Sequence, residues 1–395
     1  MKATLRHALS ITAPTLALAT LVLGTGCRSR REEAGPTPDV SVATAARPPA
    51  TMSLTARPGM VWIPDGTLRA GTAPQVAPRV ADEELPGTAM PMKGFYIDLY
   101  PFPNEPGSIP TTNVTRDEAA KACASKGKRL CTELEWERAC KGPDNTTFEY
   151  GMTYRSGVCG TGMSPERASK RPNGERAACK SAFGVFDMHG GVSEWTDSAW
   201  ARKHNETGLG VLRGGNARAG ELVGRCSNAL ARVPASRDTT VGFRCCAGTR
   251  NEASVDLDIR PLPTFERLKD VTAVTAPLAD VSTNLWGSRE TQASEYEFLR
   301  AWFWRPVAGE ELLVALGCEK HTGPWSHCGV VVARVLDGKA SLLAQFATGN
   351  RLADLVHKED APRSLRARSV DTRGTFARDF EYMYGRIGVT EEQRP

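Results

Sequence analysis

The sequence lacks the short patterns that mark several common classes of enzyme and nucleic-acid-binding protein. Its 395 residues contain no G-x-S-x-G nucleophile elbow, no phosphate-binding loop and no H-x-x-x-H-x-E iron motif. The net charge of +5 is scattered and forms no basic stripe, so we expect no nucleic-acid partner. No pair of C-x-x-C knuckles is present, which argues against a thiolate metal cluster. With 41% hydrophobic and 24% charged residues, the chain has an ordinary globular composition and enough length for two domains.

Long apolar runs are also absent, with one exception at the N-terminus. Ala8–Leu23 is apolar, follows the basic residues Lys2 and Arg6, and leads into L-V-L-G-T-G-C, which ends at Cys27. This segment resembles a bacterial lipoprotein signal, in which Cys27 is lipidated and becomes the mature N-terminus. An ordinary secretory signal that happens to contain a cysteine is the alternative.

The lipoprotein interpretation predicts both the location of the protein and its contact with the membrane. Residues 1–27 form the signal peptide, and residues 28–58, rich in Pro, Ala, Thr and Arg, form a disordered tether. We therefore expect the bacterial cell envelope, on the outer membrane or the periplasmic face, with membrane contact through the lipid anchor only. The cysteine count agrees, because eleven cysteines minus Cys27 leave ten, an even number suited to five disulfides in an oxidising compartment.

Two cysteine groups leave alternatives open. Cys245 and Cys246 are adjacent, so they are either a redox or metal site or two structural cysteines with separate partners; strain in a bond between neighbours favours separate partners. Cys318 and Cys328 enclose two histidines, His321 and His327, which gives crude zinc-ligand types. A local disulfide across this short loop is the favoured interpretation.

One stretch, Gly184–Thr196, combines acidic residues with glycines and reads G-V-F-D-M-H-G-G-V-S-E-W-T. Its glycines permit a tight turn that would bring two carboxylates and two carbonyls to one centre. Such an oxygen-only set is what calcium prefers. The predicted calcium ligands are the side chains of Asp187 and Glu194 and the carbonyls of Gly190 and Val192. The alternative is a plain glycine turn, and His189 within it is expected to face solvent.

Several further segments make this stretch part of a larger pattern. It resembles the G-L-Y-D-M-x-G-N-V-W-E-W signature of the formylglycine-generating enzyme, or sulfatase-modifying factor, family. Five other segments resemble that family's motifs in the same order: Met60–Gly71, Phe95–Tyr100, Gly127–Ala139, Leu212–Gly215 and Val241–Arg244. The resemblance covers about residues 59–248. It implies an α+β fold with little regular secondary structure, related to C-type lectins and stabilised by glycine turns, disulfides and bound calcium.

Two helices are expected within this part of the chain. Thr115 followed by Glu118 forms a capping box that begins a helix over Thr115–Lys126. Thr132 followed by Glu135 begins a second helix, which runs to about Cys140. Relatives carry a disulfide that implies a bond between Cys123 and Cys226. Loop lengths favour two local bonds, Cys159 with Cys179 and Cys318 with Cys328, and leave Cys131 and Cys140 to Cys245 and Cys246 in an unassigned order.

The resemblance also shows where the family's chemistry is missing. Family enzymes oxidise a sulfatase cysteine to formylglycine with a copper ion held by two thiolates, because soft thiolates suit Cu(I). The two matching positions hold Ala219 and Gly224. We therefore expect no copper and a divergent, non-catalytic member that acts as a calcium-stabilised binding or scaffolding module, with an envelope protein or a glycan as ligand. The alternative is a formylglycine-generating oxidase, or a related oxidoreductase, that uses displaced ligands.

The composition changes after the last family motif. Residues 249–263 are expected to be a linker, and residues 264–395 a smaller β-rich domain without a family resemblance. Its expected strands are Glu311–Leu316, Val330–Leu336 and Ser341–Ala347, the last two joined at Asp337-Gly338, a strong hairpin signal. A C-terminal helix is expected near Ala377–Tyr384. A sensor whose ligand binds residues 264–395 is a further functional alternative.

Overall fold

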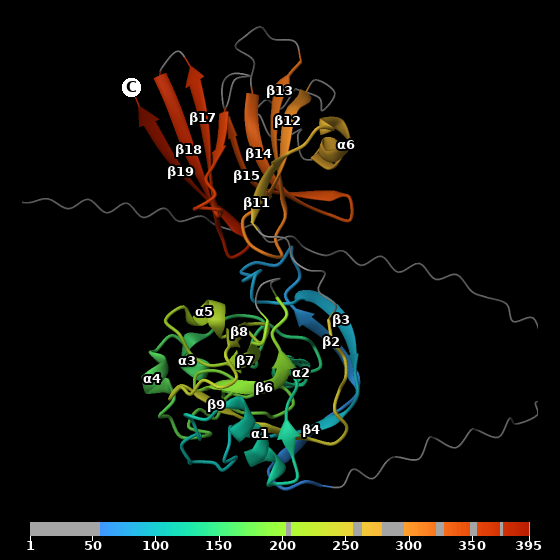
Figure 1. Cartoon of the computed structure of the whole chain (residues 1–395), viewed down its shortest axis with the longest axis vertical. Helices are drawn as coiled ribbons and strands as arrows, with labels where there is room; N and C mark the ends of the chain where they lie inside the picture. The colour runs from blue at the N-terminus through green and yellow to red at the C-terminus, as the bar shows by residue number, and fades with distance from the viewer. Residues whose placement is uncertain are drawn as a thin grey trace, which may run out of the picture. The chain divides into compact units, whose positions relative to one another are not determined.

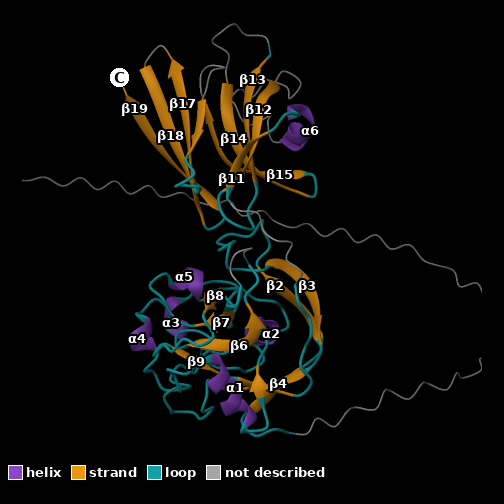
Figure 2. Ribbon diagram, viewed as in Figure 1, coloured by secondary structure: helices purple, strands orange, loops and turns teal. Residues whose placement is uncertain are grey.

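The computed structural model describes residues 56–202, 207–255, 263–278, 296–320, 328–347, 354–371 and 374–394. The signal segment, Cys27 and the tether up to residue 55 lie outside this range. The described chain is strand-rich with few and short helices (Figure 2). Within it, no helix combines the length and the apolar character needed to cross a membrane.

The described residues between 56 and 255 form a mixed domain of short strands and short helices (Figure 1). One sheet has the strand order β1-β4-β10-β5, a second has β8-β7-β6-β9, and β2 pairs with β3 alone. The strands are β1 Met60–Ile63, β2 Gly66–Gly71, β3 Pro86–Met92, β4 Phe95–Asp98, β5 Arg129–Leu130, β6 Ser193–Ala199, β7 Gly210–Gly214, β8 Ala229–Arg232, β9 Val241–Phe243 and β10 Cys245–Ala247. The helices are α1 Arg116–Ala124, α2 Glu133–Lys141, α3 Ser156–Cys159, α4 Pro165–Ala168 and α5 Gly220–Val223.

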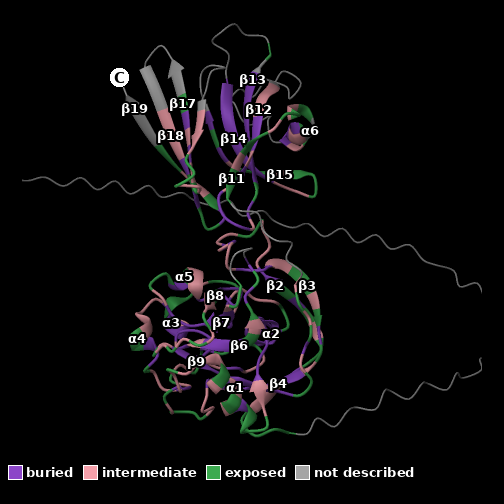
Figure 3. Cartoon of the chain, in the orientation of Figure 1, coloured by how far each residue is buried: buried purple, intermediate pink, exposed green. Residues whose placement is uncertain are grey.

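Helices α1 and α2 begin where the sequence predicts. Thr115 accepts from the backbone N–H of Glu118 while the Glu118 carboxylate accepts from the backbone of Thr115, and Thr132 and Glu135 repeat this arrangement. The two helices differ in burial. Every residue of α2 is buried, as Figure 3 shows, although five of its nine side chains are charged.

Helix α2 can be buried because its charged side chains find partners. Glu133 accepts from Arg202 at 3.0 and 2.6 Å and from Arg213 at 2.7 Å. Glu137 contacts Arg213 at 3.0 Å and Lys141 at 2.8 Å. Removing one member of such a group would leave a buried charge without compensation, so these contacts fix the position of the helix.

The adjacent cysteines of β10 point in opposite directions. Side chains alternate along a strand, so Cys245 faces α1 and bonds to Cys123, while Cys246 faces the other side and bonds to Cys131. The structure therefore favours the structural interpretation of this pair. It also shows that the predicted bond between Cys123 and Cys226 is wrong, because the two side chains lie in different core clusters.

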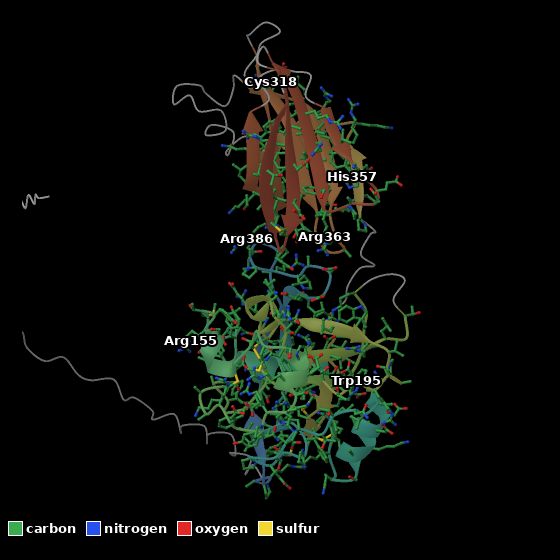
Figure 4. All side chains as sticks on the ribbon, turned by 90° about the vertical axis from the view of Figure 1, so that its left-hand side faces the viewer. Arg155, Trp195, Cys318, His357, Arg363 and Arg386 are labelled. Carbon is green, nitrogen blue, oxygen red and sulfur yellow. A yellow bond between two sulfur atoms is a disulfide. The ribbon has the colours of Figure 1, made fainter. Side chains whose placement is uncertain are left out.

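Cys226 instead bonds to Cys140 on α2, so the expectation that Cys140 pairs with the adjacent cysteines is wrong. The local bonds follow the loop lengths: Cys159 bonds to Cys179, and Cys318 to Cys328. Cys318, which is labelled in Figure 4, forms a disulfide with Cys328, so neither sulfur is a thiolate that could bind zinc. The two histidines of that alternative, at 321 and 327, lie outside the described residues.

The expected linker is not wholly free of the first domain. Asn251 is buried, its N–H and side-chain amide both donate to Glu135 at 3.1 Å, and Ala253 and Val255 pack against the cluster around Leu68. Residues 256–262 are not among those described.

The described residues between 264 and 394 form two antiparallel sheets that share one hydrophobic core. The orders are β11-β12-β13-β14-β15 and β16-β17-β18-β19. The strands are β11 Thr264–Arg267, β12 Tyr296–Arg305, β13 Leu312–Glu319, β14 Cys328–Leu336, β15 Lys339–Ala347, β16 Asp354–His357, β17 Ser364–Asp371, β18 Gly374–Met383 and β19 Arg386–Arg394. Helix α6, Val271–Thr275, and the short η1, Ala276–Leu278, cover the other face of the five-stranded sheet.

In this part of the chain one predicted element is confirmed and one is wrong. The turn Asp337-Gly338 joins β14 to β15, and both residues have positive φ, as this hairpin type requires. The helix expected near Ala377–Tyr384 is wrong, because this segment is strand β18. Phe380 and Tyr382 enter the shared core while Asp379 and Glu381 do not, which is the pattern of a strand.

Candidate functional site

The stretch Gly184–Thr196, called the signature turn below, leads into strand β6. Asp187 and Gly190 have φ of 52° and 79°, which brings the backbone back on itself before the strand begins. A Cβ at position 190 would lie 1.9 Å from the carbonyl oxygen of Cys159, so only glycine fits there. The turn therefore packs closely against the segment that the Cys159–Cys179 disulfide holds in place.

Arg244 binds the oxygens at the end of the signature turn. Its Nε donates to Glu194 Oε2 at 2.6 Å and its Nη2 to Oε1 at 2.8 Å. The same Nη2 reaches the carbonyls of Phe186 at 3.0 Å and Asp187 at 3.3 Å. Trp136 Nε1 donates to Glu194 Oε2 at 2.7 Å, and both partners are fully buried. One guanidinium group thus gathers oxygens from both ends of the turn.

A second guanidinium group binds the middle of the turn. Arg171 Nη1 donates to the carbonyl of Gly190 at 2.6 Å and to that of Cys159 at 2.8 Å. Asp187 Oδ2 accepts from the backbone N–H of Gly174 at 2.6 Å. Burial raises the pKa of Asp187, although this hydrogen bond and the charges of Arg244 and Arg171 act against the rise.

This geometry does not fit the predicted calcium centre. Of the four expected ligands, Glu194 and the Gly190 carbonyl each face a different guanidinium group. A divalent cation would have to sit beside these positive charges, which Coulomb repulsion opposes. The two arginines thus bind two of the four groups that calcium was expected to bind, and the Asp187 carboxylate accepts from a backbone N–H instead.

His189 is buried, so its predicted exposure is wrong. Glu149 accepts from the His189 backbone N–H at 3.1 Å, and its second oxygen lies 3.0 Å from Nδ1. The ring packs edge-on against Trp136 with centroids 5.5 Å apart. Glu149 also lies within reach of Cys140, Cys159 and Cys179, an arrangement with metal-ligand residue types, but all three sulfurs are in disulfides.

The two positions that match the family's copper ligands flank helix α5. Ala219 is its exposed N-cap residue and Gly224 its buried C-cap residue. A Cβ at Gly224 would lie 2.7 Å from the carbonyl oxygen of Gly220, so the present backbone leaves no room for a cysteine there. The described cysteines are all in disulfides, so none of them offers a free thiolate for Cu(I).

A cleft of about 540 Å³ lies next to α5. Its walls are residues 72–78 after β2, residues 145–154 after α2, and the segment that contains Glu221 and Arg225. Apolar side chains on these walls are partly exposed: Val76 at 48% and Met152 at 66%. Phe148 and Tyr154, with ring centroids 5.5 Å apart, add aromatic surface. The volume is within the usual range for a ligand site.

A second cavity, of about 670 Å³, lies over strands β16–β19. Arg366 and Arg368 line it together with Asp379 and Glu381. Arg366 donates to both oxygens of Asp379, at 2.6 and 2.5 Å, and this contact lowers the pKa of Asp379. The surface is zwitterionic.

The fold and these sites define a disulfide-rich α+β domain with a partly apolar cleft and no free thiol among its described cysteines. Residues 103–249 match the model of the sulfatase-modifying factor enzyme 1-like domain, and the chain carries a domain of that family.

The chain is similar both to a protein named as an inactive enzyme and to a protein named as a formylglycine-generating enzyme. The chain is 28% identical over 167 residues to the inactive C-alpha-formylglycine-generating enzyme 2 of Bos taurus, covering 35% of this chain and 50% of that protein. It is 28% identical over 163 residues to the formylglycine-generating enzyme of Mus musculus, covering 35% and 44%. The chain thus spans about half the length of the curated relatives it matches. Among solved structures, PvdO from Pseudomonas aeruginosa has a TM-score of 0.40 and 21% identity, covering 47% of this chain and 93% of that one.

Sequence reasoning missed most partners of the site residues. Arg244 ends the V-G-F-R motif and Arg213 lies in L-R-G-G, so the motifs contained a signal for both without assigning a role. Glu149 and Arg171 lie in an irregular segment without periodicity, where no sequence signal could have found them.

Proposed function

We propose that this protein is a non-catalytic member of the sulfatase-modifying factor family that binds an extended polypeptide segment in the cleft beside α5. The observation that carries the proposal is the pair Ala219 and Gly224, which offers no sulfur where the family's oxidase chemistry needs two thiolates. In this proposal the first domain keeps the C-type-lectin-related fold as a binding scaffold, and residues 264–395 are a separate β-rich domain.

The cleft supports a polypeptide ligand by its chemistry. Val76 and Met152 present exposed apolar surface, and the partly exposed Tyr154 provides an aromatic face for apolar side chains. Glu221 at the rim adds a charged group that can orient a ligand. Contiguous partly apolar surface with polar groups around it is typical of an interaction site.

A paired assay tests this function. A fluorescein-labelled sulfatase-motif peptide is titrated with the protein, and anisotropy reports binding; mass spectrometry of the same peptide, with copper and oxygen supplied, reports conversion of its cysteine to the aldehyde. We expect binding without conversion. Met152→Glu, which places a charge on the apolar wall, should weaken binding, whereas Val233→Glu, at an exposed apolar residue that does not line the cleft, should not.

Conversion by the unaltered protein would replace this proposal with the oxidase alternative. Cys245 and Cys246, the sequence-based candidates for displaced ligands, are both in disulfides, so turnover would have to begin with their reduction.

We further propose that Cys27 carries a lipid anchor that holds the protein at the cell envelope. The basic residues, apolar run and small residues before Cys27 support this. Detergent partitioning of the expressed protein against Cys27→Ser tests it: the unaltered protein should enter the detergent phase and the variant should not. Equal partitioning of the two proteins would contradict the proposed lipid anchor at Cys27.

A further inference from the structure

The loop between β2 and β3, residues 72–85, has contacts on two sides; we call it the cleft loop. On one side Thr72, Val76 and Pro78 line the cleft. On the other side its residues contact the C-terminal strands. A single segment therefore belongs both to the proposed binding site and to the boundary with residues 264–394.

Charged contacts fix the cleft loop to the first domain. Arg225 Nη1 donates to the carbonyl of Pro78 at 2.6 Å and to Glu84 Oε2 at 3.1 Å, and both charged side chains are buried. Asn228 Nδ2 donates to Glu83 Oε2 at 2.9 Å. Arg225 itself lines the cleft, so the conformation of the loop and the shape of the cleft are linked.

Arg79 makes the contact with the C-terminal strands. Its backbone N–H donates to the carbonyl of Tyr384 at 3.0 Å, and its Nη1 and Nη2 both donate to the carbonyl of Gly309 at 3.3 Å. Its Nη1 lies 3.5 Å from Glu310 Oε2. Arg79 is 1% exposed, so this contact is shielded from bulk solvent, and the next buried residue, Ala81, lies in the core that the two sheets share.

The acceptor of this ion pair is part of a buried network. Glu310 accepts from Arg334 at 2.9 and 3.1 Å and from the Tyr382 hydroxyl at 2.9 Å. Arg334 Nη2 also donates to the carbonyl of Gly385, in the turn between β18 and β19. The network thus holds Glu310 and this turn in the positions that Arg79 contacts. The low dielectric of the interior strengthens the hydrogen bonds of this network, in which Arg79 Nε is the one atom of the Arg79 guanidinium group without a partner among the described residues.

We propose that the C-terminal strands regulate the cleft through Arg79 and the cleft loop. Docking of Arg79 on Glu310 and the β18–β19 turn holds the loop in the conformation that shapes the cleft. Occupancy of the cleft and stability of the β18–β19 turn are then coupled, and the coupling is reciprocal because it is a free energy between two sites. The inference rests on the proposed binding role of the cleft.

Hydrogen exchange of the full chain tests the coupling without any ligand. Arg79→Met keeps an apolar stem of similar length and removes the charged donors. Amide exchange in residues 72–85 and in the β18–β19 turn should rise about tenfold, the factor expected for losing a hydrogen bond to a charged group. Arg79→Lys keeps the charge with fewer donors, so it should give a smaller rise in exchange in the same two regions. This variant replaces Arg79→Met in the test if Arg79→Met does not fold.

Arg363→Ala is the matched control. Arg363, labelled in Figure 4, contacts Asp82 of the cleft loop at 3.5 Å, but the Arg363 side chain is 51% exposed. Exchange should stay within about twofold of the unaltered protein, because exposed pairs contribute little. Unchanged exchange of the cleft loop in both Arg79 variants would overturn the coupling.

The labelled sulfatase-motif peptide supplies the second measurement. Saturating peptide should slow exchange in the β18–β19 turn of the unaltered protein and leave that of Arg79→Met unchanged. Peptide that binds without affecting the turn overturns the inference and leaves the proposed function intact. A peptide that does not bind overturns the proposed function, and the ligand-free comparison of the Arg79 variants then decides the coupling alone.

Discussion

Arg244 compensates the charge of Glu194 in the interior of the first domain. Both side chains are buried, and the only other side chain that donates to the Glu194 carboxylate among the described residues is Trp136. Arg244→Met should therefore lower the free energy of unfolding by about 3–5 kcal/mol, the cost of leaving one buried charge unpaired. Urea denaturation followed by tryptophan fluorescence measures this loss.

The control for that variant is Arg250→Met. Arg250 pairs with Asp197 at 3.1 Å, but both side chains are more than a third exposed, so the loss should stay below about 1 kcal/mol. A similar loss in both variants would mean that the Arg244 contacts do not stabilise the signature turn.

The free energy of unfolding should depend on pH through Glu133. Burial by itself would raise its pKa, but the charges and hydrogen bonds of Arg202 and Arg213 outweigh burial and lower the pKa to about 2. Because the folded pKa is below the unfolded one, the contribution is fully present above about pH 4.5 and is lost as the pH falls toward 2. It amounts to about 3 kcal/mol at neutral pH.

Glu133→Gln removes this titration. The difference in unfolding free energy between the unaltered protein and the variant should therefore shrink as the pH is lowered from 6 to 2, in a denaturant series at each pH. Glu252→Gln, at an exposed residue paired with Arg250, should show a small and constant difference. A constant difference for Glu133→Gln would contradict the assigned pKa.

At the scale of elements, helix α5 decides whether the missing thiolates can be restored. A side chain at Gly224 meets the Gly220 carbonyl oxygen at 2.7 Å and Thr161 Cγ2 at 3.2 Å, so Gly224→Cys should cost about 1–3 kcal/mol. Ala219→Cys, at an exposed position, should change stability by less than about 0.5 kcal/mol. Thermal melting of the two single variants measures both effects.

The same steric contact predicts the outcome for copper. The double variant Ala219→Cys, Gly224→Cys should not compete with bathocuproine for Cu(I), because the second thiol cannot occupy its site without moving the Gly220 backbone. Tight binding with an unchanged melting temperature would show that the helix retains the family's copper geometry.

Elements were predictable where the signal is local. Both capping boxes and the Asp337-Gly338 hairpin depend on residues within a few positions of each other, so the sequence is enough to identify them. The predicted helix over Ala377–Tyr384 is wrong because the length and charges of this segment suit either a helix or a strand. The burial of Phe380 and Tyr382, two residues apart, in the shared core shows that side chains alternate between two faces, as they do in a strand.

At the scale of the whole molecule, disulfides and guanidinium groups hold the described segments together, and calcium at the signature turn stays a prediction to be tested. Reduction should unfold the protein, because each native disulfide contributes about 2–5 kcal/mol and five of them exceed an ordinary net stability of about 5–15 kcal/mol. Chelator should leave the melting temperature unchanged, since Arg171 and Arg244 place two positive charges beside the Gly190 carbonyl and the Glu194 carboxylate. A lower melting temperature in chelator, restored by calcium, would reinstate the predicted metal centre.

Motifs and short loops are local properties of the chain, so the family resemblance of the first domain, the capped helices, the absence of sulfur at Ala219 and Gly224, and the local disulfides could all be read from the residues alone. Which distant cysteines bond, the burial of His189 and the contact of Arg244 with Glu194 became known from the folded chain. The physical reason is that these contacts join segments separated by 40 to 122 residues, and their partners depend on which face of a strand or helix each side chain occupies.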